Sequence, residues 1–446
     1  MVRNLAEGNV RKTLWQFTLP MFVSVIFQQM YNLADSAIAG KYAGESALAA
    51  VGASYPITMI FMAIAVGSNI GCAVVISQYF GGGQYRKMKT AVSTTMIAST
   101  VVSLLLTVLG LILSRPLLRA MHTPEDIFYQ GDLYLRIYIL GLLFLFLYNV
   151  STGVFTSLGD SRTPLYFLIG SSVGNIVLDY IFVAVFGFGV AGVAWATFIA
   201  QGLACILAVL FLAQRIVKIQ TTGRPTVRFS MAMLRKICRI AVPSILQQSF
   251  VSVGNLFIQG LVNSFGSGVL AGYSAAVKLN NFAITSFSTI GNGVSSFTAQ
   301  NIGAGKPDRV KKGFFAGTQM VLLIAVVFLI VYLCFGKYAM SLFMENVSGE
   351  AMGSGVLYLH VLSPFYLAIS IKLVADGILR GASAMSSFMI STFTDLILRV
   401  VLAFAFSAVW GSMGIWLAWP VGWVISTALS LVFYARGKWK GDLISI

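Results

Sequence analysis

The stretch LPMFVSVIFQQMYNLAD at residues 19–35 decides the fold, because VPSILQQSFVSVGNLFI at residues 242–258 is a second copy of it. Identical residues at a constant offset of 223 include Pro20 and Pro243, Asn32 and Asn255, and Leu33 and Leu256. The segments SQYFGGGQ (77–84) and AQNIGAGK (299–306) repeat in the same way at an offset of 222. Such regular spacing indicates that one half of the chain duplicates the other.

The composition places both copies in a membrane. Of the 446 residues, 58% are hydrophobic and 10% are charged, and the mean hydropathy is +0.86, whereas about a quarter of the residues in a soluble domain are charged. A helix that spans a bilayer needs about 20 apolar residues. Twelve stretches reach that length and predict an all-α integral membrane protein with two six-helix lobes: 14–39, 48–80, 91–113, 133–158, 165–186, 190–212, 240–262, 269–299, 314–335, 356–379, 388–409 and 415–434.

The basic residues predict how these spans are oriented. The chain has 30 Lys and Arg against 14 Asp and Glu, a net charge of +16. With twelve spans both termini share one side, and 22 of the 30 basic residues fall in the termini and loops of that side. Because loops rich in Lys and Arg stay in the cytoplasm, we expect a multi-pass protein of the plasma membrane, the bacterial inner membrane, with both termini cytoplasmic. Long apolar segments separate the charges, so no nucleic-acid surface is predicted.

The duplication divides the chain into two lobes. We predict an N-terminal lobe at 1–216, a cytoplasmic linker at 217–234 and a C-terminal lobe at 235–446. Copies with six helices each share an orientation, so a pseudo-twofold axis along the membrane normal is expected to relate them. Two such lobes suit a transporter that opens to either face in turn, and the duplication disfavours a channel. Pro20 and Pro243 are interpreted as residues of the helix starts rather than as hinges.

The residue types exclude several kinds of site. Gly81–Gly83 and Gly303–Gly305 lack the G-x-x-x-x-G-K-[ST] pattern of a phosphate loop, so no ATP site is predicted. His122 and His360 are the two histidines and are far apart, which disfavours the clustered catalytic set of a membrane enzyme. We therefore expect neither an enzyme nor a cofactor, apart from a coupling ion. The cysteines lie far apart without a C-x-x-C pair, which disfavours a metal site or a disulfide: Cys72, Cys205, Cys238 and Cys334.

Four short motifs carry a family resemblance. They are the Q-x-x-G-x-G end of the second helix from Gln78, its echo in the eighth helix from Gln300, the LGDSRTP turn at 158–164 and the L-D-Y run from Leu178. Together they resemble the multidrug and toxic compound extrusion (MATE) family, in its DinF-like branch, and the resemblance covers essentially the whole chain. It implies a V-shaped twelve-helix fold and the efflux of organic, often cationic, compounds in exchange for protons or sodium ions.

Acidic residues inside the spans are the first place to look for chemistry, because a charge near the bilayer centre costs on the order of 3 kcal/mol. Asp376 follows Lys372 by four positions, which places both on one helix face. Asp395 precedes Arg399 by the same spacing. A neighbouring cation favours the ionised carboxylate, so we interpret both acids mainly as structural partners of these bases. Direct substrate or ion binding by them stays open.

Asp35 and Asp179 have no basic residue three or four positions away. Burial without a cation favours a neutral carboxyl group, and two carboxyl groups in one site reinforce this. A reversible site for a proton or a sodium ion, with Na⁺ held at Asp35 and Asp179, is therefore predicted in the first lobe. The alternative is a polar cluster that only holds helices together. Polar residues at i,i+4 spacing or on nearby helices are expected to complete the site: Tyr31, Asn175, Asn149, Thr152 and Thr197.

The family resemblance implies the same site. Archaeal and DinF-like members use an Asp in the first helix, an Asn-x-x-x-Asp in the fifth, a Thr in the sixth and polar residues in the fourth. Thr152 stands where some members have Asn. Four residues of this chain match the pattern: Asp35, Asn175, Asp179 and Thr197. At the repeat offset Asp35 corresponds to Ile258 and Asp179 to Val401, so ion coupling is expected in the first lobe alone.

The chain is therefore interpreted as a secondary active exporter of small organic compounds that works as a monomer in contact with membrane lipid. Some sodium-coupled relatives have an acid in the seventh helix, where this chain has two glutamines. A flippase for lipid-linked oligosaccharide, in the same superfamily, is the nearest rival, but it needs a cationic cavity for a diphosphate, and the buried bases here mostly have acidic partners. Six polar residues are expected to line a substrate cavity: Gln28, Asn32, Gln247, Gln248, Asn255 and Asp376.

Overall fold

The computed structural model describes residues 4–221, 227–341 and 349–440. Within these ranges the regular structure is helical, and no strand occurs. Part of the predicted linker, 222–226, and the end of the predicted C-terminal lobe, 441–446, lie outside the described residues. The α-helices are α1 (Val10–Ile38), α2 (Glu45–Gly81), α3 (Tyr85–Ala120), α4 (Glu125–Leu140), α5 (Leu142–Ser157), α6 (Arg162–Asp179), α7 (Gly189–Lys218), α8 (Met231–Asn263), α9 (Ser267–Gly303), α10 (Pro307–Ser341), α11 (Gly349–Leu362), α12 (Tyr366–Gly381), α13 (Met385–Trp410) and α14 (Ser412–Ala435).

Each of the twelve predicted stretches is helical. Among the described residues, nine helices are long and apolar enough to cross a membrane, or ten if α4 and α5, which meet at a 47° bend, form one span. The count of nine treats α11 and α12 as a single stretch, Gly349–Gly381. α1 and α9 are not among them, since amides and charged residues interrupt their apolar runs. The prediction of an all-α membrane protein is confirmed.

The chain forms two compact units, and the first helix of each sequence copy contributes to both. Unit 1 contains Val23–Ser249, and unit 2 contains Leu5–Phe22 together with the chain from Phe250 onward. The first half of α1 therefore packs in unit 2 and its second half in unit 1. For α8 the order is reversed, with the first half in unit 1 and the second half in unit 2. The predicted lobe boundaries assign residues 5–22 to the N-terminal half, whereas their packing groups them with the C-terminal half.

Both prolines shared by the two copies lie within helices. Pro20 is inside α1 and Pro243 is inside α8, so their interpretation as residues of the helix starts is wrong. Each proline comes shortly before the position where its helix passes from one unit to the other. A membrane helix tolerates an interior proline because neighbouring helices can satisfy the carbonyl that the missing N–H leaves free.

Small residues let the helices of unit 1 approach closely. A Cβ atom on Gly67 of α2 would lie 2.7 Å from the backbone N of Ile245, and one on Gly71 would lie 2.7 Å from Ala241 Cα. α2 and the first half of α8 are therefore in backbone contact, as expected where helices associate in lipid. Buried apolar side chains of α2, α3, α4 and α5 fill the core beside them: Ile57, Phe61, Leu118, Leu135, Leu142 and Phe146.

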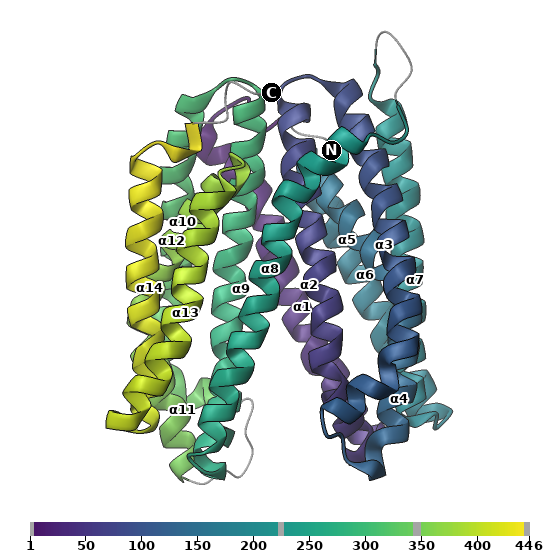
Figure 1. The fold of residues 1–446 in the computed structure, drawn as a ribbon, viewed down its shortest axis with the longest axis vertical. Helices are drawn as coiled ribbons and strands as arrows, with labels where there is room; N and C mark the ends of the chain where they lie inside the picture. Colours follow the sequence, from purple (N-terminus) through teal and green to yellow (C-terminus); the bar gives the residue numbers. More distant parts are fainter. Residues whose placement is uncertain (1–3, 222–226, 342–348, 441–446) are drawn as a thin grey trace. The chain divides into compact units, whose positions relative to one another are not determined.

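Unit 2 is held together by glycine contacts and by an aromatic cluster. A Cβ atom on Gly272 of α9 would lie 2.9 Å from the backbone N of Gly355 in α11. The Trp416 ring centroid of α14 lies 5.3 Å from that of Tyr273 and 5.1 Å from that of Tyr358. Figure 1 shows α13 and α14 side by side within this unit.

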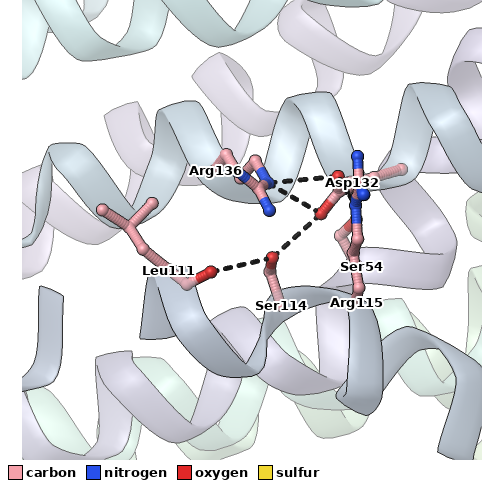
Figure 2. Close-up of polar contacts among 7 residues, drawn as sticks. Ser54, Leu111, Ser114, Arg115, Asp132 and Arg136 are labelled. Carbon is pink, nitrogen blue, oxygen red and sulfur yellow. Dashed lines mark hydrogen bonds and ion pairs between the residues drawn. The ribbon is translucent and has the colours of Figure 1, made fainter. Parts of the chain in front are cut away.

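Asp132 of α4 shows how unit 1 neutralises a buried carboxylate. The residue is 4% exposed, and its oxygens lie 3.0 Å from Arg115 Nε and 3.0 Å from Arg136 Nε. Ser114 donates a further hydrogen bond of 2.9 Å. Figure 2 shows Arg136 and Ser114 converging on this one side chain, which joins α3 to α4. Because two cations share the carboxylate, it stays ionised and structural.

Candidate functional site

Asp35 and Asp179 lie in unit 1, each near the end of an α-helix. Asp35 is partly buried in α1, and Asp179 is 1% exposed at the last residue of α6. A π-helical turn follows each of them, Ala39–Ala43 after α1 and Tyr180–Val185 after α6. These two turns contact one another, and the Tyr42 and Tyr180 rings meet edge to face. Widened turns of this kind frequently occur at functional sites, because they leave backbone groups without their regular partners.

The two carboxyl groups are close enough to interact electrostatically, and they share a tyrosine neighbour. Tyr31, one helical turn before Asp35, donates a hydrogen bond to Asn175 Oδ1. Asn175 is 3% exposed and lies one turn before Asp179. Thr197 of α7 lies beside Tyr31. The structure thus brings together five of the residues that the sequence singles out: Tyr31, Asp35, Asn175, Asp179 and Thr197.

The carboxyl groups of Asp35 and Asp179 differ from the buried acid of unit 1 described above, because no basic side chain that the structure describes is paired with them. Among the described residues no lysine or arginine forms an ion pair with Asp35 or Asp179, in contrast to Asp132. Three of their oxygens are buried without a hydrogen-bond partner, one on Asp35 and both on Asp179. A buried ionised oxygen without a partner is costly, so these three oxygens are open acceptors within unit 1. Within the described ranges, no group of three His, Cys, Asp or Glu side chains could hold a metal ion.

The two predicted residues of α5 are directed to their own helix. Asn149 Nδ2 donates to Leu145 O at 2.8 Å, and Thr152 Oγ1 donates to Asn149 O at 2.8 Å. These donors satisfy backbone carbonyls rather than the carboxylates of Asp35 and Asp179. Residues with short polar side chains commonly bond this way inside a helix, which spacing along the sequence does not reveal.

Tyr134 of α4 also lies near the two carboxyl groups, although the sequence alone does not single it out. It is partly buried and interacts electrostatically with both Asp35 and Asp179. Its ring stacks on Tyr138 at a centroid distance of 6.5 Å, and both tyrosines line a small pocket together with Thr197 and Gln201. Tyr134 and Tyr138 lie four residues apart within an apolar span, and a buried hydroxyl group needs a polar neighbour. This spacing is the feature of the sequence that could have indicated a polar site here.

In unit 2 the predicted pairing of Lys372 with Asp376 is found. Lys372 Nζ lies 2.7 Å from Asp376 Oδ2, and Ser430 Oγ donates to Asp376 Oδ1 at 2.6 Å. Lys372 and Asp376 are each 3% exposed. A carboxylate that is held by a cation and a hydroxyl group has little need of a further ligand. Asp376 therefore belongs to the internal framework of unit 2.

Asp395 and Arg399 interact electrostatically as the spacing predicts, but no ion pair joins them among the described residues. Within the described chain, Asp395 Oδ1 and Arg399 Nε are buried without hydrogen-bond partners. The Arg399 guanidinium instead lies 4.2 Å from the centroid of the Trp419 ring. The face of an indole ring attracts a cation, so α14 competes with Asp395 for this side chain. Spacing along α13 could not predict that competition.

The residues expected to line a substrate cavity are divided between the two units. Gln28 and Asn32 of α1 are exposed, and the two glutamines of α8, Gln247 and Gln248, are partly buried; all four belong to unit 1. Asn255 and Asp376 belong to unit 2. The described structure does not gather the six into one site within either unit.

Comparison with known proteins points to one family. The MatE family model matches residues 20–181 and 243–405. The chain is 30% identical to the "Probable multidrug resistance protein YpnP" of Bacillus subtilis, over 98% of this chain and 97% of that one. A solved structure of a MOP superfamily transporter from Pyrococcus furiosus shares 23% identity at a TM-score of 0.89, covering 99% of this chain and 98% of that one. A second, described as the outward-facing conformation of a multidrug resistance MATE family transporter, shares 24% identity at a TM-score of 0.89 with the same coverage.

Proposed function

This chain belongs to the MATE family of multidrug efflux transporters, and on that premise we propose that it exports small organic, often cationic, compounds in exchange for protons or sodium ions. The observation that carries the proposal is the carboxylate pair of Asp35 and Asp179, which is buried without a basic partner in the described chain. The relatives named as multidrug resistance proteins support the cargo class. The pair supports the ion coupling.

In this proposal, the negative charge of Asp35 and Asp179 couples ion binding to substrate export. Binding of a proton or Na⁺ at Asp35 and Asp179 neutralises the pair in the outward-facing state, and bound substrate then leaves. Release of the ion on the cytoplasmic side restores the acceptors that Asn175 and Tyr31 help to position, and substrate binds again. An ion drives such a cycle only if its affinity differs between the two states. The π-helical turns beside both acids are the local elements that such a change in charge reaches first.

Transport by purified protein in proteoliposomes tests this proposal. We expect Asp35→Asn and Asp179→Asn to lose export driven by an imposed pH or sodium gradient while still eluting as folded protein on size exclusion. Glu125→Gln is the matched control, because it removes a carboxylate from the exposed start of α4. Undiminished coupled export by both site variants would refute the proposal. Separate imposition of the two gradients identifies the ion.

We also propose that the protein works as a monomer with both termini in the cytoplasm. The excess of basic residues on the side of the termini supports this orientation. Labelling of single cysteines introduced at Lys218 and Lys337 tests it, because the proposed orientation exposes these positions on opposite sides. Equal accessibility of both positions to an impermeant thiol reagent in intact cells would contradict it.

A further inference from the structure

Unit 1 contains a large basic pocket that is separate from the carboxylate pair. Its volume is about 1030 Å³, and it lies where the end of α2 and the start of α3 meet the start of α8. Three cations line it, Arg86 and Lys87 from α3 and Lys236 from α8. Tyr79 and Tyr85 provide aromatic surface between them. The proposed transport function makes no use of this pocket.

Tyr79 holds two of these cations in place. Lys87 Nζ lies 5.7 Å and Lys236 Nζ lies 5.6 Å from the centroid of its ring. Lys236 Nζ also donates to the Tyr79 hydroxyl oxygen at 3.1 Å. Cation–π contacts orient a charge without neutralising it. The two ammonium groups therefore keep their full charge within one short stretch of the pocket wall.

Acidic residues are missing from the segments that build the pocket. The sequence has no Asp or Glu from residue 46 to 124, nor from residue 180 to 307. In the part of the chain that the structure describes, Arg86, Lys87 and Lys236 form no ion pair. The positive charge of the pocket is therefore not balanced by the protein itself.

Two helix starts add to this positive potential. α3 begins at Tyr85, and its N-cap residue Gln84 makes no capping hydrogen bond through its side chain. α8 begins at Met231, where Ser230 Oγ accepts a hydrogen bond from Met233 N at 3.4 Å, and neither helix has an acidic residue in its first turn. The start of a helix carries a partial positive charge and free N–H groups, which attract anions. Three cations and two helix starts thus converge on one cavity.

The second copy of the same sequence shows what balances such a site. In unit 2 Lys306 and Arg309 occupy the corresponding loop and helix start, and their donors reach the chain before α1. Lys306 Nζ donates to Ala6 O at 3.0 Å, and Arg309 donates to three carbonyl oxygens at 2.8–3.2 Å: Leu5, Glu7 and Gly8. α10 also has an acid, Asp308, in its first turn. The pocket beside it has a volume of about 450 Å³, and the cations of this copy are already paired with acceptors of the protein.

We propose that the basic pocket of unit 1 binds the phosphate group of an anionic phospholipid. A phosphate supplies the acceptors that residues 5–8 supply in unit 2. The rim favours a lipid over a soluble anion, because exposed apolar side chains adjoin the cations: Val227 is 54% exposed and Phe229 is 39% exposed. Clusters of Lys and Arg beside spanning helices attract anionic headgroups in this way. On the proposed orientation, the lipid comes from the cytoplasmic leaflet.

Native mass spectrometry of the full-length protein in detergent tests the site, with phosphatidylglycerol and phosphatidylcholine as probes. We expect phosphatidylglycerol to bind more tightly. The double variant Lys87→Gln/Lys236→Gln should lower that affinity about 25-fold, about fivefold for each cation removed. The matched control Lys311→Gln/Lys438→Gln removes two exposed charges elsewhere and should leave the affinity within about twofold of that of the parent. Equal loss in both double variants, or equal binding of the two lipids, would overturn the proposal.

A further variant and a competition experiment test whether Tyr79 belongs to the site and whether the ligand is a lipid. Tyr79→Phe keeps the ring but removes the hydroxyl group that accepts from Lys236, so we expect an intermediate loss of phosphatidylglycerol affinity. The proposal would also be overturned if neither Tyr79→Phe nor Lys87→Gln/Lys236→Gln lowered the affinity for phosphatidylglycerol. Glycerol 3-phosphate at millimolar concentration should not displace the lipid. Complete displacement would show that a soluble phosphate, and not a lipid, is the ligand. Because these readouts do not depend on transport, they stand apart from the tests of Asp35 and Asp179.

Discussion

Two buried acids, Asp376 in unit 2 and Asp179 in unit 1, differ in the residue that lies one helical turn before them. In unit 2 Lys372 precedes Asp376 by four residues, and their charged atoms lie 2.7 Å apart. In unit 1 Asn175 precedes Asp179 by the same four residues, but its amide is neutral and both carboxylate oxygens lack partners. The same helical spacing therefore produces a closed ion pair in one copy and an open acid in the other. For these two acids, the residue one turn before the carboxyl group is a lysine in unit 2 and a neutral amide in unit 1.

The largest expected effect comes from opening the closed pair. Lys372→Met leaves Asp376 buried without its cation, which should destabilise the protein by about 3–5 kcal/mol. Thermal unfolding of the purified protein in detergent measures the change. The double variant Lys372→Met/Asp376→Leu should recover most of the stability, because it removes both charges. A single variant as stable as the parent would show that the pair is not the framework we describe.

The next largest effect comes from closing the open pair. Asn175→Lys gives unit 1 the spacing and charge of unit 2, so Asp179 should stay ionised and lose its affinity for the coupling ion. Gradient-driven export in proteoliposomes should fall about a hundredfold, near the upper end of typical coupling between sites. Asn175→Gln keeps a neutral amide and serves as the control. Export that survives the lysine would place the ion elsewhere.

A smaller effect is expected at the tyrosine beside the pair. Tyr31→Phe removes the hydrogen bond to Asn175 Oδ1, which is worth about 1 kcal/mol. The concentration of coupling ion at half-maximal transport should therefore change about fivefold, with the maximal rate nearly kept. Tyr129→Phe, at a position that is 72% exposed, is the control. An unchanged ion dependence would remove Tyr31 from the site.

The smallest effect is expected at α5. Asn149→Ala removes a side chain whose amide bonds to the backbone of its own helix, so transport should stay within about twofold of that of the parent, as for substitutions outside such sites. The same proteoliposome assay measures it. If export falls as far as in Asn175→Lys, Asn149 acts on the ion directly, and the open site of unit 1 extends to α5.

The fold and the core of the candidate site follow from local features of the sequence. Long apolar runs predict helices because a helix satisfies its own backbone in lipid. Asp35 and Asp179 stand out because charge is rare inside spans and no base lies one turn away. Tyr134 and the Trp419 partner of Arg399 could not be predicted, since both come from other helices, and the sequence does not say which faces of two helices meet.

The sequence by itself determined the duplication, the helices, the excess of basic residues outside the spans and the scarcity of acids within them, because each of these depends on residue type and spacing along one chain. The tertiary structure decided which of those acids are neutralised. It also decided that the first halves of α1 and α8 pack in opposite units, and that carbonyl oxygens of residues 5–8 accept hydrogen bonds from Lys306 and Arg309 in unit 2. These outcomes depend on which side chains from distant segments come within a few ångströms of a charge, where Coulomb attraction and hydrogen bonding are strong enough to choose between partners.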